Sequence, residues 1–364
     1  TNYQDLISAN KKKNIRICGA GIIDLTALDW HARRSMVFCD CENIEIEDVI
    51  FIGAAHWTLP FFGCRNVHVN RARLLAYREN SDGIDLVDTQ NALIENCFLR
   101  TGDDAICLKS MALTKQVETH DIIVRKCIVW NDKVRAFGVA GESRHDIYNA
   151  IFEDCDVLHS MADWTTEVGA LAVYICDAAK VHHIVFRNIR IRQESNYAIC
   201  CVITRDKWSS DERAGQVEDI LFEDIKMDGV LTPFVVNSYY WCCDPDGHST
   251  YVSTKEPLPV DERTPRIKEL AFRNIEAHNC HVAGTFIYGL PEAKIEKVTM
   301  ENIEIDFAEN PTPEYPAMMA EVEPCTNRGV FINNVKELTL KNVKVHGTAG
   351  EPFEIENVDC VEKE

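Results

Sequence analysis

The amino-acid sequence predicts an all-β protein folded as one right-handed parallel β-helix, a solenoid of about eleven rungs. Three observations predict this fold. A short phrase of alternating apolar residues recurs along nearly the whole chain, its copies mostly follow one another at intervals of about 22 to 40 residues, and Asn or Asp often stands at its centre. Such a unit holds two or three short strands but lacks room for a crossover helix at every step.

The recurring phrase has the alternation of a β-strand that buries one face. Its copies read IEIEDVIF from Ile44, VHVNRARL from Val67, ALIENCFL from Ala92, IIVRKCIV from Ile122, AIFEDCDV from Ala150, IVFRNIRI from Ile184, ILFEDIKM from Ile220, LAFRNIEA from Leu270, VTMENIEI from Val298 and LTLKNVKV from Leu338. The alternative, a horseshoe of leucine-rich repeats, requires leucines at fixed offsets and a helical half-repeat, and neither is visible.

We expect a single domain over residues 1–364. The β-helix should run from residue 14 to about residue 358, because the phrase recurs over that span. Longer loops should leave the solenoid near residues 160–170, 206–216, 241–264 and 306–330.

The polar centre of the phrase predicts a bend on every rung. It is occupied by Asp48, Asn96, Asp154, Asn188, Asp224, Asn274, Asn302 and Asn342. These side chains tolerate left-handed backbone dihedrals and should hydrogen-bond the backbone groups of neighbouring rungs. Cys97, Cys127 and Cys155 directly follow this position in three successive rungs, which predicts an internal stack of thiols.

The composition is that of an ordinary globular protein, with 46% apolar and 26% charged residues in 364. The formal net charge of −20 repels phosphate backbones and anionic lipid surfaces, so we expect neither a nucleic acid nor a membrane as partner. No window approaches the roughly 18 uninterrupted apolar residues of a membrane span.

The 16 cysteines include no paired C-x-x-C motif of the zinc type. We interpret them as free thiols that pack like small hydrophobic side chains, and expect no disulfide, metal or cofactor. Free thiols favour a reducing, cytoplasmic location, or a secreted one if a leader was removed. Residues 1–13 are too short to cap the first rung. Either a second copy covers that rung in a homo-oligomer, or the native protein has more sequence before Thr1.

The strongest chemical signal is NSDGID from Asn80, followed one rung later by TGDDAI from Thr101. Aligning the apolar residues of the two strands sets Asp82 beside Asp104, in strands about 4.8 Å apart, with Asp103 adjacent. Crowded carboxylates repel one another, so at least one of their pKa values should rise. A protonated acid beside ionised bases suits glycosidic bond cleavage, and a calcium-binding turn is the alternative.

NSDGID and GDDAICLKS resemble the N-T-D and D-D motifs of the polygalacturonase family, glycoside hydrolase family 28, whose fold is a right-handed parallel β-helix. The stretches NIRICGAGIIDL from Asn14, CENIEIEDVIF from Cys41 and HWTLPFFGCRNVHV from His56, with Trp30 and Arg33–Arg34 between the first two, are similar to that family in order and spacing. The resemblance covers residues 14–130 well and the later rungs only by repeat pattern.

The resemblance implies an inverting glycoside hydrolase. In it, Asp103 is the general acid, and Asp82 and Asp104 activate the attacking water. Two family motifs are missing. Ala136, in VRAFGVAGES, stands where the family has the histidine of Gly-His-Gly, and GALAVYICD from Gly169 stands where it has Arg-Ile-Lys.

The missing cationic motif shifts the expected substrate. A buried carboxylate without a cationic partner is costly to bind, so we expect a neutral or differently substituted glycoside rather than plain galacturonan. The alternatives are a polygalacturonase or exo-galacturonidase proper, a β-helix polysaccharide lyase or epimerase, and a non-catalytic carbohydrate-binding solenoid.

Further polar and aromatic residues should lie along the same column as the aspartates and contact the sugar. They are His56, Trp57, Lys109, Arg135, Glu142, Tyr174, Arg205 and Trp241. Each has a structural alternative. Lys109 and Arg135 could instead neutralise the aspartates, Glu142 could pair with Arg135, and the aromatic rings could pack within loops. If Arg135 and Glu142 pair, no positive charge remains for an anionic substrate.

Overall fold

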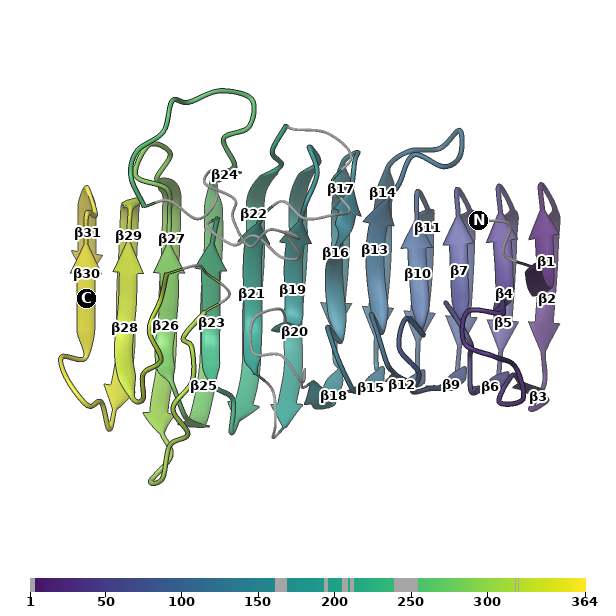
Figure 1. Cartoon of the computed structure of the whole chain (residues 1–364), viewed down its shortest axis with the longest axis horizontal. Coiled ribbons are helices and arrows are strands. Elements are labelled where there is room, and N and C mark those ends of the chain that lie inside the picture. The colour runs from purple at the N-terminus through teal and green to yellow at the C-terminus, as the bar shows by residue number, and fades with distance from the viewer. Residues whose placement is uncertain are drawn as a thin grey trace.

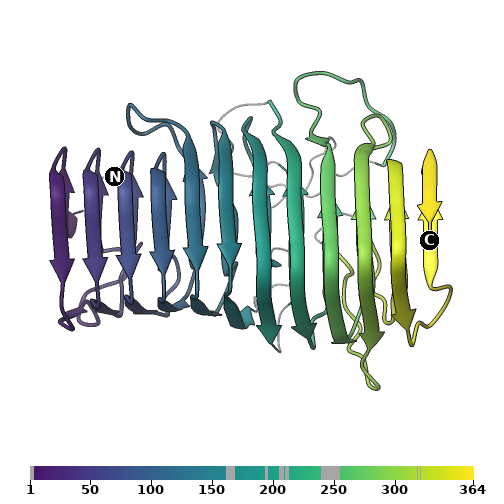
Figure 2. The same cartoon turned by 180° about the vertical axis from the view of Figure 1, so that it is seen from behind.

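The computed structural model describes residues 4–160, 169–192, 196–204, 209, 213–238, 255–317, 319 and 321–364. These residues form two long sheets of parallel strands and contain no α-helix. The strands stack along one axis from the N-terminal to the C-terminal end of the chain, as Figures 1 and 2 show from opposite sides. The prediction of an all-β parallel solenoid is confirmed. No helix in the described part of the chain is long and apolar enough to cross a membrane.

Sheet A is the sheet that carries the site, and it contains twelve strands where the sequence predicted about eleven rungs. In spatial order they are β1 (Gln4–Asn10), β4 (Arg33–Cys39), β7 (Leu59–Phe62), β10 (Ile84–Val87), β13 (Ile106–Ser110), β16 (Phe137–Ser143), β19 (Gly169–Ile175), β21 (Tyr197–Ile203), β23 (Thr232–Asn237), β26 (Ala283–Tyr288), β28 (Arg328–Asn333) and β30 (Phe353–Glu356).

Sheet B contains the other nineteen strands. They are β2 (Lys13–Cys18), β3 (Ile22–Asp24), β5 (Glu42–Glu47), β6 (Ile50–Ile52), β8 (Arg65–Asn70), β9 (Arg73–Ala76), β11 (Gln90–Glu95), β12 (Phe98–Thr101), β14 (Thr119–Arg125), β15 (Ile128–Asn131), β17 (Ile147–Glu153), β18 (Asp156–Ser160), β20 (Lys180–Arg192), β22 (Gln216–Asp228), β24 (Arg266–Ile267), β25 (Glu269–Cys280), β27 (Ile295–Phe307), β29 (Val335–His346) and β31 (Cys360–Lys363). Early rungs carry two short strands of this sheet. Both β17 and β18 pair with the single long strand β20, where the two columns merge.

The core fills the inside of the solenoid with side chains that repeat from rung to rung. Phe152, Phe186, Phe222 and Phe272 occupy matching positions in successive strands, all fully buried. Their ring centroids are 4.9, 4.9 and 5.5 Å apart. Each rung therefore buries its apolar face against its neighbours, as the recurring phrase predicts.

The polar centres of the phrase form ladders along the outside of the solenoid. All eight residues predicted there have the left-handed backbone conformation. In the later rungs these side chains hydrogen-bond one another rather than the backbone groups that the sequence analysis predicted. Asn302 donates to Asn274 and Asn342 donates to Asn302, each at 3.0 Å. An amide carries both a donor and an acceptor, so stacked copies satisfy one another.

The thiol stack is also confirmed. Cys97, Cys127 and Cys155 are buried, and the backbone N–H of Cys127 lies 3.4 Å from the sulfur of Cys155. All fourteen cysteines in the described residues are free, while Cys242 and Cys243 lie outside that part of the chain.

The strand register positions the site. Ile84 of β10 pairs with Ile106 of β13, as the alignment of the apolar residues predicts. The segments just before β4, β7, β10, β13 and β16 therefore lie in successive rungs along one edge of sheet A, about 4.8 Å apart. Six of the predicted site residues lie in these segments: His56, Trp57, Asp82, Asp103, Asp104 and Arg135.

Candidate active site

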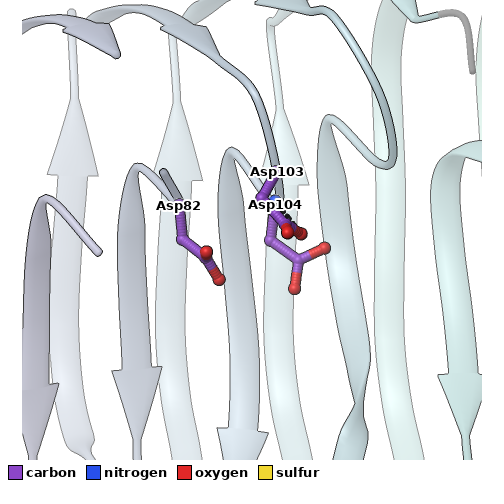
Figure 3. Close-up of side chains that lie close together, drawn as sticks. All are labelled: Asp82, Asp103 and Asp104. Carbon is purple, nitrogen blue, oxygen red and sulfur yellow. Dashed lines mark hydrogen bonds between the residues drawn. The ribbon is translucent and has the colours of Figure 1, made fainter. Parts of the chain in front are cut away.

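Three aspartates, called here the aspartate cluster, lie where β10 and β13 begin: Asp82, Asp103 and Asp104 (Figure 3). The backbone N–H of Gly83 donates to the carbonyl of Asp104 at 2.8 Å, which holds the two turns side by side. A Cβ on Gly83 would lie 2.3 Å from the carbonyl oxygen of Ala105, so only glycine permits this approach. One carboxylate oxygen of each aspartate lies within 4.8 Å of the others.

Lys109 of β13 lies among the carboxylates, with its side chain only 2% exposed. Its Nζ lies 2.8 Å from Asp82, 2.8 Å from Asp85 and 3.2 Å from Asp104. Although burial lowers the pKa of Lys109, the charges of Asp82 and Asp85 raise it well above its usual value. Lys109 is therefore a permanent buried cation. The sequence left two roles open for Lys109, and the structure favours neutralising the aspartates over contacting a sugar.

Arg135, just before β16, holds Asp104 from a second direction. Its Nη1 lies 3.0 Å from Asp104 Oδ1, and its Cζ lies 5.0 Å from the ring centroid of Tyr174 in β19. Tyr174 is only 5% exposed, so it presents little surface to a sugar and instead packs against the guanidinium. Burial raises the pKa of Asp104, but the charges of Arg135 and Lys109 lower it below its usual value. Asp104 is accordingly an ionised carboxylate.

Asp103 differs from the other two members of the cluster because no ion pair to it occurs among the described residues. It is partly exposed, and its Oδ1 accepts a hydrogen bond from the backbone N–H of Asp104 at 2.9 Å. Burial of the carboxyl and the charges of Asp82 and Asp104 raise the pKa of Asp103 well above its usual range. These effects favour the protonated form of Asp103, in contrast to Asp104.

Asp82 and Asp85 share the one ammonium of Lys109. Burial raises the pKa of Asp82 well above its usual value, and the charge of Lys109 offsets this only in part. Burial likewise raises the pKa of Asp85 to about 7. Asp82, Asp85 and Lys109 therefore titrate as one coupled group. Asp82 Oδ1 is buried and has no hydrogen-bond partner among the described residues.

Asp85 and Asn131 are two site residues that the sequence analysis missed. Asn131, fully buried at the end of β15, donates to the carbonyl of Asp103 at 2.6 Å and to that of Arg135 at 3.0 Å. It thereby ties together the turns that carry the acid and the guanidinium. Asp85 had a usable signal, because strand alternation places it on the same face as Lys109 once Ile84 is aligned with Ile106. Asn131 had none, because its bonds to its own turn and to the carbonyl of Asp103 occur once and follow no repeat.

His56 and Trp57 lie in the turn before β7, one rung before Asp82, as predicted. The ring of Trp57 covers the ammonium of Lys109, with Nζ 4.1 Å from the ring centroid. His56 Nδ1 accepts the backbone N–H of Trp57 at 2.7 Å, and burial lowers the pKa of His56 to about 4. His56 is therefore a neutral imidazole near neutral pH. Contact of either residue with a sugar stays a prediction.

The remaining predicted residues are less informative. Glu142 of β16 is partly exposed and makes no ion pair with Arg135 in the described part of the chain, so the structure does not support pairing of these two, one of the alternatives that the sequence left open. Arg135 pairs with the nearer Asp104 instead. Ala136 is fully buried in the apolar core. Arg205 and Trp241 lie outside the described residues.

Clustered carboxylates also suit a hard cation such as Ca²⁺, which was the alternative interpretation of the motif. In this site the ammonium of Lys109 contacts Asp82 and Asp104, and Arg135 contacts the other oxygen of Asp104. These contacts favour an internally neutralised acid–base cluster over a calcium site.

Comparison with known proteins agrees with this chemistry. A profile of glycosyl hydrolases family 28 matches residues 6–203, more than half of the 364-residue chain. Polygalacturonase QRT2 of Arabidopsis thaliana is 21% identical over 323 residues, which cover 82% of this chain and 63% of that protein. A polygalacturonase of Persea americana is 22% identical over 246 residues, covering 67% of this chain and 41% of its own length. The chain thus spans less than two thirds of these relatives.

Among solved structures, the family 28 exopolygalacturonase of Yersinia enterocolitica superposes with a TM-score of 0.57 at 15% identity. The superposition covers 99% of this chain and 62% of the exopolygalacturonase. This similarity supports the parallel β-helix fold. The family profile confirms the resemblance on which the aspartate motifs were interpreted: the chain belongs to glycosyl hydrolases family 28.

Proposed function

We propose that this protein hydrolyses a glycosidic bond of an oligo- or polysaccharide, with Asp103 as the general acid. The observation that supports this proposal most strongly is the difference between Asp103 and Asp104 within the aspartate cluster. Asp103 is partly exposed, has no cationic partner in the described part and has a raised pKa, while Asp104 is ionised between Lys109 and Arg135. A proton donor beside a fixed carboxylate is the arrangement that glycoside hydrolysis requires.

In this mechanism Asp82 and Asp104 bind and deprotonate the attacking water. Both oxygens of Asp104 are in ion pairs, and one oxygen of Asp82 is bound to Lys109, so neither carboxylate is free to turn and attack the sugar itself. The unpartnered Asp82 Oδ1 remains as the acceptor for a water proton. Water attack with concerted departure of the leaving group inverts the anomeric centre.

We expect the first product to have the opposite anomeric configuration to the substrate, because water rather than a carboxylate attacks. The nearest oxygens of the cluster lie within 4.8 Å of one another, whereas the carboxyl groups of most inverting glycosidases are roughly 6.5–9.5 Å apart. Because the short spacing would also suit a carboxylate nucleophile, the configuration of the product decides whether water or a carboxylate attacks. Proton NMR of the anomeric signals during the first minutes of hydrolysis gives the answer. A product that retains configuration would identify Asp82 or Asp104 as a nucleophile.

For the substrate we propose a neutral sugar. The aspartate cluster and Asp85 supply four carboxyl groups against two cations, and both cations are already in ion pairs. A uronate carboxylate bound here would add a charge without a partner among the described residues, which is costly. The second candidate is polygalacturonate, the substrate named for the relatives from Arabidopsis thaliana and Persea americana.

Methyl-esterified and free oligogalacturonates separate these two candidates, because they share the same sugar and linkage and the methyl ester removes the charge on each sugar. We expect faster hydrolysis of the fully esterified chain than of polygalacturonate, with the difference shrinking as salt screens the net charge of −20. Reducing-sugar release measures both rates, and a panel of neutral plant oligosaccharides and aryl glycosides extends the comparison. Faster cleavage of polygalacturonate at low salt would establish the second candidate.

A further inference from the structure

A row of four aromatic rings leads from the aspartate cluster to the protein surface. Trp57 covers Lys109, and its ring meets that of His56 edge-on at 6.1 Å. His56 lies 4.8 Å from His31, whose ring stacks on Trp30 at 3.8 Å, all measured between ring centroids. The first rings are largely covered, but Trp30 at the outer end is 56% exposed.

Trp30 is held in this exposed position by its surroundings. Its indole N–H donates to the carbonyl of Glu79 at 2.9 Å, and His31 is 2.7 Å from the side-chain amide of Asn80. Arg78 donates two further hydrogen bonds of 2.7 Å each to backbone carbonyls of the loop before Trp30. These hydrogen bonds hold the loop and the indole in place, with one face of the indole stacked on His31. Single exposed apolar residues are common on protein surfaces. An exposed aromatic ring that is held in place by a hydrogen bond and contacts other rings leading to the active site is a candidate binding surface.

The position of Trp30 relative to the cluster fits a neighbouring sugar. Trp30 lies in the segment before β4, and Asp82 lies in the segment before β10. Two rungs separate them, which corresponds to about 10 Å along the solenoid axis. Glu79 and Asn80, which hold Trp30 and His31, belong to the same turn as Asp82.

We propose that the exposed face of Trp30, backed by His31, is a platform that stacks on a sugar ring of the substrate next to or beyond the sugars at the cleaved bond. The ligand is the face of a pyranose ring formed by its C–H groups, because a fixed indole offers a flat apolar surface and its one donor is already used. This inference rests on the proposed function for the identity of the substrate. It predicts that longer substrates bind better than short ones through this residue.

The test compares Trp30→Ala with the wild-type protein on a 4-nitrophenyl glycoside and on an oligosaccharide of four or more sugars. We expect the KM for the oligosaccharide to rise about tenfold, as for loss of one aromatic contact, with kcat and the turnover of the aryl glycoside unchanged. Trp30→Phe keeps a ring and should recover most of the affinity. Trp130→Ala is the matched control. Trp130, in sheet B, also donates its indole N–H, to Asp132, and stacks on His159, and it is 37% exposed.

Direct binding separates failure of this inference from failure of the proposed function. Fully methyl-esterified tetragalacturonate is titrated by calorimetry into Asp103→Asn, with and without Trp30→Ala. Weaker binding after loss of Trp30 supports the platform even if the wild-type protein hydrolyses no sugar, which would refute the function alone. Equal affinities, including no binding by either variant, overturn the platform. An equal loss of turnover on short and long substrates would also overturn it, since Trp30 would then only support the turn of Asp82.

Discussion

Replacing Asp103 by Asn should lower kcat on unactivated oligosaccharides about 10²–10⁴-fold, equivalent to about 3–5 kcal/mol in the barrier. Asparagine has no proton to give the leaving oxygen. The fold should be unaffected, because the side-chain carbonyl of Asn can still accept the backbone N–H of Asp104 that Asp103 Oδ1 accepts at 2.9 Å. Steady-state kinetics and thermal unfolding measure the two effects.

The leaving group distinguishes a lost acid from a lost base. An aryl glycoside with a strongly acidic phenol needs no protonation, so Asp103→Asn should retain most of its activity on it. Asp104→Asn should not, because water activation is still required. Asp48→Asn is a control for the loss of a surface carboxylate, since Asp48 pairs with Arg71 in an exposed position. Near-native turnover of unactivated oligosaccharides by Asp103→Asn would contradict the assignment.

The repeat and the aspartate motifs could be interpreted from sequence because they obey local rules. Strand alternation and the register of Ile84 with Ile106 together dictate that Asp82 and Asp104 are neighbours. Because equivalent residues of successive rungs stack on one another, the sequence also predicted the thiol stack and the positive-φ residues at the centre of the recurring phrase, such as Asn302. A solenoid brings residues one rung apart into contact, so spacing in the sequence translates directly into position.

The ion-pair partners within the site could not be predicted from sequence spacing in this way. Arg135 had two acidic neighbours in the sequence analysis, and only side-chain geometry decides that it pairs with Asp104 rather than Glu142. The row of rings that ends in Trp30 depends on a loop whose path is fixed by hydrogen bonds to the turn of Glu79. Such contacts follow from three-dimensional packing and leave no periodic signal.

Replacing Lys109 by Met should destabilise the protein by about 3–5 kcal/mol, because it removes the cation from a buried cluster while keeping the length of the side chain. The loss should be greatest near neutral pH. Without the ammonium, the folded-state pKa values of Asp82 and Asp85 rise further above the unfolded value of about 3.9, and Asp104 loses one of the two cations that lower its pKa. The folded state then binds more protons than the unfolded state, so stability falls as the pH increases through that window and is nearly restored below about pH 4. Denaturant unfolding at several pH values measures this.

The same substitution separates a role in catalysis from a role in folding, because the bases that activate water depend on Lys109 for their charge. The acidic limb of kcat/KM should move to higher pH by about one unit or more, since Asp82 then ionises later. Adding Asp85→Asn to Lys109→Met removes one uncompensated carboxyl and should recover part of the stability. It should leave the acidic limb displaced, because Asp82 still lacks its cation. Lys226→Met is the control, since Lys226 pairs with Glu276 on the surface with a 68% exposed side chain. If Lys109→Met lost stability but kept the wild-type pH profile, Lys109 would be a structural cation that does not tune the bases.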